Sequence, residues 1–101
     1  MEPKNVAVII RDVPNQWEGL RSTLGMAIDF DGPHMFVIGE LQIPDDKVSI
    51  YKESLEYLAD VLEGKNFTDN NANLENWDFF EYMSLDDMAR KLPEYDLIIP
   101  F

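Results

Sequence analysis

Asn5-Val6-Ala7-Val8-Ile9-Ile10-Arg11 is a continuous apolar run that is rich in β-branched residues. Such a run predicts a strand that is covered on both faces, as in a parallel sheet. His34-Met35-Phe36-Val37-Ile38-Gly39-Glu40 has the same character and predicts a second buried strand. The stretch between the two runs is long enough to hold a helix, which is what a parallel pair of strands needs.

Apolar residues at helical spacing follow each of these two runs. Trp17, Leu20 and Leu24 predict a helix from about residue 15 or 16 to residue 29, which Asp31-Gly32-Pro33 ends. Small residues in it, Gly19 and Gly25, are expected to let the helix lie close to the sheet. A second helix is predicted from about residue 46 to residue 62, with its apolar face formed by Val48, Tyr51, Leu55, Leu58 and Leu62.

The rest of the chain continues the alternation. We expect a short strand at 65–68, a loop with at most one helical turn at 69–77, and a short strand or packed loop at 79–82. Ser84 resembles a helix N-cap, and the helix 85–92 after it is expected to bury Leu85, Met88, Ala89 and Leu92. Residues 96–101 predict a terminal strand. Alternating strands and helices predict an α/β fold with a largely parallel sheet of four or five strands and helices on both faces.

Length, charge and composition exclude several classes of protein. The 101 residues are 46% apolar and 12% aromatic, which is typical of one globular domain spanning residues 1–101. A net charge of −12 opposes binding to nucleic-acid phosphates and to anionic membrane surfaces. The N-terminus lacks the parts of a signal peptide, and no apolar run reaches the ~20 residues of a membrane helix. We therefore expect a cytoplasmic protein with neither nucleic acid nor a membrane as partner.

Four segments together resemble the DsrE/DsrF-like family of sulfur-relay proteins, which includes TusD-type subunits. They are Trp17-Glu18-Gly19-Leu20-Arg21-Ser22-Thr23-Leu24-Gly25-Met26-Ala27, Met35-Phe36-Val37-Ile38, Tyr82-Met83-Ser84-Leu85-Asp86-Asp87-Met88-Ala89 and Asp96-Leu97-Ile98-Ile99-Pro100-Phe101. The resemblance covers nearly the whole chain. It implies a flavodoxin-like three-layer sandwich and a homo-oligomer, either a trimer or a hexamer.

The resemblance also implies where sulfur chemistry would occur. In active members a cysteine in the loop after the third strand carries a persulfide. In this chain that loop is Thr68-Asp69-Asn70-Asn71-Ala72-Asn73, and the whole sequence has no cysteine. The Thr68 hydroxyl is no substitute, because its pKa is far above that of a thiol and it forms no stable persulfide. We therefore expect no catalytic residue of the family's kind and no sulfurtransferase activity.

A ligand site is expected where the strands end, because open α/β sheets bind ligands outside the carboxyl ends of their strands. Residues 11–18, 39–43, 68–73 and 100–101 should meet there. Arg11 ends an apolar strand and could hold an anion with two hydrogen bonds, and Arg21 lies one helical turn after Glu18. An alternative is that these arginines only form ion pairs that hold the first loop and helix. The candidate ligand-binding residues are Arg11, Asp12, Glu18, Arg21, Asp69, Asn70 and Asn71.

Other chemistry is not indicated. The chain has no GxGxxG or Walker-type pattern, so no nucleotide cofactor is expected. Asp45, Asp46, Asp86 and Asp87 lie where helix N-termini favour negative charge, and we expect no metal there. His34 is the only histidine and lies at the start of its strand, away from the expected site.

Two classes of function follow. The first is a non-catalytic, DsrE-like binding or assembly subunit. The aromatic residues Trp77, Phe79, Phe80 and Tyr82 would serve this class if they form a subunit interface rather than core. The alternative is a small-anion or small-ligand-binding protein, or an enzyme, that uses the loops at the carboxyl ends of the strands.

Overall fold

The computed structural model describes residues 5–26, 33–60 and 65–101. The strands are β1 (Val6–Ile10), β2 (His34–Val37), β3 (Lys65–Thr68), β4 (Phe80–Tyr82) and β5 (Leu97–Pro100). The helices are α1 (Gln16–Met26), α2 (Asp45–Asp60), α3 (Asn71–Asn76) and α4 (Leu85–Lys91), with 3-10 turns at Val13–Asn15 and Leu92–Glu94. The predicted helix ends at 27–29 and 61–62 and the terminator Asp31-Gly32 lie outside the described residues.

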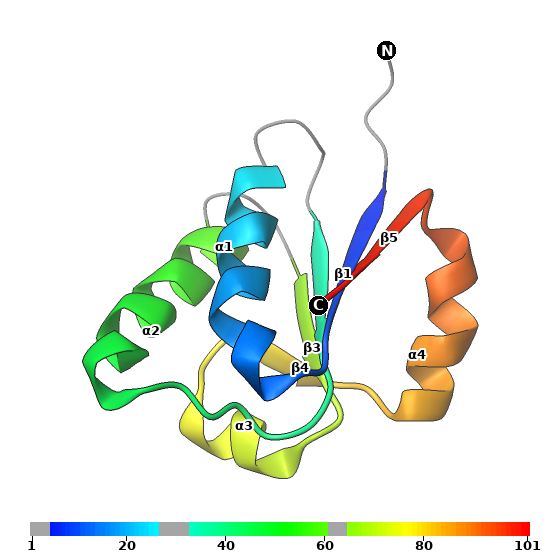
Figure 1. The fold of residues 1–101 in the computed structure, drawn as a ribbon. Helices are drawn as coiled ribbons and strands as arrows, with labels where there is room; N and C mark the ends of the chain where they lie inside the picture. The colour runs from blue at the N-terminus through cyan, green and yellow to red at the C-terminus, as the bar shows by residue number, and fades with distance from the viewer. Residues whose placement is uncertain (1–4, 27–32, 61–64) are drawn as a thin grey trace.

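All five strands are parallel and stand in the order β4-β3-β2-β1-β5. Helices α1 and α2 cover one face of the sheet and α4 the other, while α3 lies at the edge where the strands end (Figure 1). The predicted flavodoxin-like three-layer α/β sandwich is therefore confirmed, with a strand order that differs from the 2-1-3-4-5 of flavodoxin itself. The chain steps from β1 to β4 in one direction and then returns to place β5 beside β1. This reversal between β1 and β5 is the switch point of the sheet.

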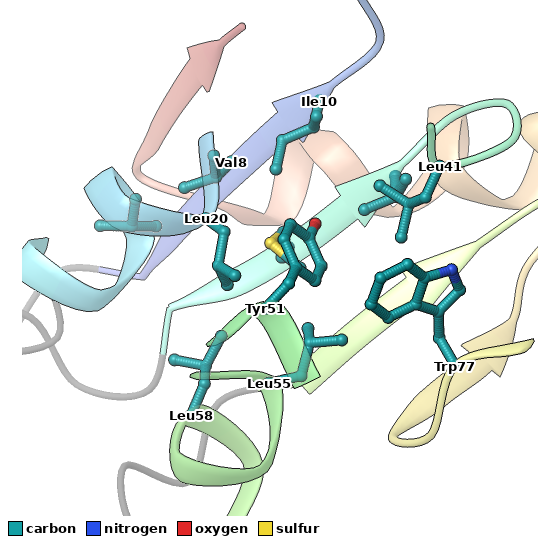
Figure 2. Packing of buried hydrophobic residues seen from close by; sticks show 11 residues of the cluster. Val8, Ile10, Leu20, Leu41, Tyr51, Leu55, Leu58 and Trp77 are labelled. Carbon is teal, nitrogen blue, oxygen red and sulfur yellow. The ribbon is translucent and has the colours of Figure 1, made fainter. Parts of the chain in front are cut away.

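The two faces of the sheet carry cores of unequal size. On the α1–α2 face, side chains from β1 and β2 pack against Leu20 of α1 and against Tyr51, Leu55 and Leu58 of α2. Figure 2 shows the Tyr51 ring between the aliphatic side chains and Trp77, whose ring centroid is 5.0 Å away. The α4 face has a small buried core of Ala7, Phe36, Phe67 and Met88.

The small second core corrects one prediction. Met88 is the only fully buried residue of α4, while Leu85 is 51% exposed and Ala89 is also exposed. Of the four side chains expected to be buried, this seven-residue helix fully buries one; Leu92, which follows its last residue, is half-buried and packs against the small core. Ser84 caps the helix as predicted, because its side chain accepts a hydrogen bond from the Asp87 N–H.

The segment 69–77 contains more regular structure than predicted. Asn71–Asn76 form α3, which begins after an N-cap at Asn70. Asn is a poor residue inside a helix but a good one before it, so an Asn-rich stretch masks a short helix in a pattern analysis.

Among the described helices, none combines the length and the apolar character needed to cross a bilayer.

Helix α1 lies close against β1 because Gly19 has no side chain. A Cβ added at Gly19 would be 2.6 Å from both Cγ1 and Cδ1 of Ile10, whose side chain is fully buried. The expected role of a small residue is thus confirmed for Gly19. It is wrong for Gly25, which is exposed and where an added Cβ meets no atom within 4 Å.

Alanine at these two glycines should have opposite effects on stability. Gly19→Ala should lower the free energy of unfolding by about 1–2 kcal/mol, because overpacking against Ile10 exceeds the gain in helix propensity. Gly25→Ala, the matched control, should raise it by about 0.5–1 kcal/mol through propensity alone. Urea unfolding followed by circular dichroism measures both. A Gly19→Ala chain as stable as the wild type would contradict the close contact.

Candidate functional site

Hydrogen bonds join the four segments expected at the carboxyl ends of the strands. The Arg11 N–H donates to the Phe101 carbonyl at 3.0 Å, which ties the loop after β1 to the end of the chain. The Ile38 N–H donates to the Ile10 carbonyl at 2.9 Å and holds the end of β2 beside β1. Side chains then connect these segments to the loops after β2 and β3. The predicted meeting of the segments is therefore confirmed.

Gln16, the first residue of α1, holds the loop between β2 and α2 from one side. Its Nε2 donates to the Glu40 carbonyl at 3.1 Å, and its Oε1 accepts from the Gln42 N–H at 2.8 Å. The side chain is 1% exposed. Both ends of one buried amide are thus used to hold two backbone groups of the same loop.

Asn73 of α3 holds the same loop from the other side. Its Oδ1 accepts from the Leu41 N–H at 2.8 Å, and its Nδ2 donates to the Gly39 carbonyl at 2.8 Å and to Thr68 Oγ1 at 2.9 Å. The residue is 1% exposed. Gly39, whose carbonyl accepts one of these bonds, has a φ of 85°, a conformation that suits glycine. The chain therefore turns at this residue.

The polar residues that follow β3 add to the framework, by which we mean the side-chain hydrogen bonds that hold the loops after β2 and β3. Asp69 accepts from the Gly39 N–H at 2.9 Å, and Asn70 caps α3 by accepting from the Asn73 N–H at 3.2 Å. Asn71 is exposed at the start of α3. The loop where the resemblance places a reactive cysteine thus supplies side chains that hold other loops in position.

A hollow of about 590 Å³ lies where β1 and β5 end, at the switch point of the sheet. We call it the Arg11 hollow. Its walls combine apolar and charged side chains, and it is lined by Ile9, Arg11, Asp12, Asn15, Glu18, Ile38, Pro100 and Phe101. Three predicted site residues, Arg11, Asp12 and Glu18, therefore come together there. Asp69, Asn70 and Asn71 do not line it.

The charges around the Arg11 hollow are exposed and nearly balanced. Arg11 Nε lies 3.8 Å from Asp12 Oδ1, a distance too long for a hydrogen bond, and their side chains are 74% and 58% exposed. Arg21 Nη1 lies 3.1 Å from Glu18 Oε1, so Arg21 neutralises the second carboxylate of the hollow. Arg21 thus pairs with a residue of its own helix, α1. The Arg11 guanidinium, which touches Asp12 only loosely, can still donate to an incoming acceptor.

His34 lies at the opposite end of the sheet, as predicted. It is hydrogen-bonded to the Tyr95 hydroxyl on the α4 face. Burial, and then the nearby Lys91 and Lys65, lower the pKa of His34, which favours the neutral ring. Burial, and then Glu94, raise the pKa of Tyr95 to about 12. Within the described residues, His34 included, no group of three or more His, Asp or Glu side chains is placed to hold a metal ion.

Gln16 and Asn73 were not identified from the sequence. Each sits at or near the start of a helix, where a polar residue is ordinary, and no sequence pattern separates a capping amide from one that is fully buried.

Comparison of the chain with protein-family models, with curated proteins and with solved structures finds no match.

Removing the Asn73 side chain should strongly destabilise the fold. Asn73→Ala removes the partner of the buried Leu41 N–H and of the half-buried Gly39 carbonyl, so we expect a loss of about 2–4 kcal/mol in the free energy of unfolding. Asn71→Ala changes an exposed residue of the same helix and should stay within about 0.5 kcal/mol of the wild type. Denaturant unfolding of the two variants tests this. Equal effects would show that Asn73 does not hold the loop.

Proposed function

We propose that this chain is a non-catalytic binding protein of the DsrE-like type, and that the Arg11 hollow receives a small anion with an apolar portion. The observation that carries the proposal is the position of Arg11 in a hollow at the switch point of the sheet, where parallel sheets bind ligands. Its guanidinium presents paired N–H donors that match a carboxylate. Ile9, Ile38 and Phe101 supply the apolar contact.

Three observations support a binding role over a catalytic one. The chain has no cysteine, and Thr68, Asp69 and Asn70 in the loop after β3 are engaged in hydrogen bonds within the fold. The carboxylates of the Arg11 hollow, Asp12 and Glu18, are 58% and 56% exposed. General acids and bases are usually tuned by burial and by charged neighbours, and exposed carboxylates lack the first of these.

Binding of a small carboxylate is the direct test of this proposal. Hexanoate should bind with a Kd of about 1 mM, in the range of a small fragment, and should shift the backbone amide signals of Arg11, Asp12 and Phe101 in ¹H–¹⁵N spectra. Arg11→Gln should weaken binding at least about tenfold, because it removes the charge that pairs with the ligand.

The control variant is Arg90→Gln, which removes an exposed arginine on α4 that pairs with Asp87 at 3.5 Å. Its affinity for hexanoate should equal that of the wild type. The proposal fails if hexylamine, which carries the opposite charge, binds as well as hexanoate, or if Arg11→Gln binds as well as the wild type.

We also propose that the chain self-associates, because one corner of the fold exposes large apolar side chains. Of the aromatic cluster, Trp77 is buried and Phe80 is half-buried, whereas Phe79 and Tyr82 are 41% and 57% exposed. Leu85, which follows Tyr82 by three residues, is 51% exposed. Tyr82 and Leu85 form what we call the β4–α4 corner, and a second copy of the chain is its proposed occupant.

The outer edge of β5 is a poorer place for a second copy. The Leu97 N–H donates to the carbonyl of Asn5, just before β1, and the Phe101 N–H donates to the carbonyl of Ile9 in β1. The backbone N–H groups of residues 98 and 100 therefore face outward along this parallel strand. Pro100 has no N–H, which leaves the Ile98 N–H as the single outward donor of β5. Strand pairing at this edge is therefore weakened, and the side chains of the β4–α4 corner become the favoured contact.

Self-association should depend on salt. Each copy carries a charge of −12, so repulsion opposes assembly until salt screens it. Sedimentation velocity should show an average mass above 11.7 kDa that increases with sodium chloride concentration. Tyr82→Lys combined with Leu85→Lys should restore the monomer, while Ile50→Lys on the exposed side of α2 should not. A wild-type chain that stays monomeric at high salt would contradict this proposal.

A further inference from the structure

A second hollow lies at the other end of the sheet from the Arg11 hollow. It has a volume of about 240 Å³ and is found where β3 and β4 begin, beside the last described turn of α2. We call it the Asn66 hollow, and it is lined by Ala59, Lys65, Asn66, Phe79, Phe80 and Glu81. It shares no lining residue with the Arg11 hollow. Any ligand of this hollow is therefore independent of the function proposed above.

Asn66 is the unusual residue of this hollow. It is 3% exposed, and within the described part of the chain neither its Oδ1 nor its Nδ2 has a hydrogen-bond partner. The other two buried amide side chains, Gln16 and Asn73, use both their oxygen and their nitrogen. Buried polar groups are almost always paired, so an amide with both ends unpaired indicates a missing partner.

The walls around Asn66 combine the apolar residues Ala59, Phe79 and Phe80 with the charged residues Lys65 and Glu81. Phe80 pairs with Asn66 across the two strands and packs against the larger core. Phe79 is 41% exposed and has a φ of 72°, which is rare for a bulky residue. An aromatic ring that is only partly covered offers its face to another flat group. The Asn66 amide atoms themselves are shielded from solvent, so a ligand can pair with them only after a side chain that lines the hollow moves aside.

We propose that the Asn66 hollow binds a small, uncharged, planar molecule that carries a hydrogen-bond donor and an acceptor on the same edge. Primary carboxamides and nucleobase edges have this chemistry. The Asn66 oxygen accepts from the ligand N–H and the Asn66 nitrogen donates to the ligand acceptor, which is the two-point pairing that an asparagine side chain makes with adenine. The flat face of the ligand packs on Phe79. A carboxylate fits poorly, because it has no N–H to donate to the Asn66 oxygen.

Benzamide is a suitable probe, because it is planar, uncharged and ends in a primary amide. In a ¹⁵N-labelled chain the Asn66 side-chain NH₂ signals should shift and saturate with a Kd of about 1 mM, a value expected for a fragment of this size. The backbone amides of residues 79–81 should shift with the same Kd, and that of Arg11 should not move. N,N-dimethylbenzamide, which has no donor, and benzoate, which has no donor and a negative charge, should leave the Asn66 signals in place.

Two variants complete the test. Asn66→Leu should weaken benzamide binding at least about tenfold, and its Tm should rise because it removes an unpaired buried amide. Asn76→Leu, which changes an exposed asparagine of α3, should bind benzamide like the wild type. Wild-type Asn66 NH₂ signals that stay unmoved at about 10 mM benzamide would show that the Asn66 amide does not pair with a primary amide. Equal binding of N,N-dimethylbenzamide, or undiminished binding by Asn66→Leu, would show that apolar contact alone is responsible. Any of these three results overturns the proposal.

Discussion

Two buried amide side chains, Gln16 and Asn73, determine how the carboxyl end of this sheet is built. Between them they bind backbone groups of four successive residues, 39–42, in the loop after β2. Gln16 begins α1 and Asn73 lies in α3, so the loop is fixed to one helix on each side. Gly19 adds to this order by letting α1 lie directly on Ile10 of β1. The loop is therefore held in place from both sides by buried side chains of the fold.

The polar side chains of the loop after β3 act as supports for neighbouring segments. Thr68, Asp69 and Asn70 use their side chains to hold Asn73, Gly39 and the start of α3. The Arg11 hollow, by contrast, lies where β1 and β5 end, and it combines exposed charged side chains with apolar ones. The framework and the proposed ligand site are thus separate parts of the same edge.

The sequence predicted the layers and the elements, because buried parallel strands and amphipathic helices have strong patterns. The run at β1, the cap at Ser84 and the meeting of Arg11, Asp12 and Glu18 were all foreseeable from spacing and from the rule that ligands bind where parallel strands end. The exposure of Leu85 was not, because it depends on how much core the opposite face offers. The burial of Asn66 and Asn73 was not foreseeable either, since an amide side chain has the same sequence signature in a turn, a cap or a core.

Hydrogen exchange at two backbone amides tests the central claim that Gln16 and Asn73 hold the loop. The Leu41 N–H donates to Asn73 and the Gln42 N–H donates to Gln16, each at 2.8 Å, and neither residue belongs to a helix or strand. If the two side chains hold the loop, both amides should exchange about as slowly as those of β1 and β2, because they open only when the fold opens. Exchange at the rate of an unprotected loop would show that the amide bonds do not persist, and would contradict the account.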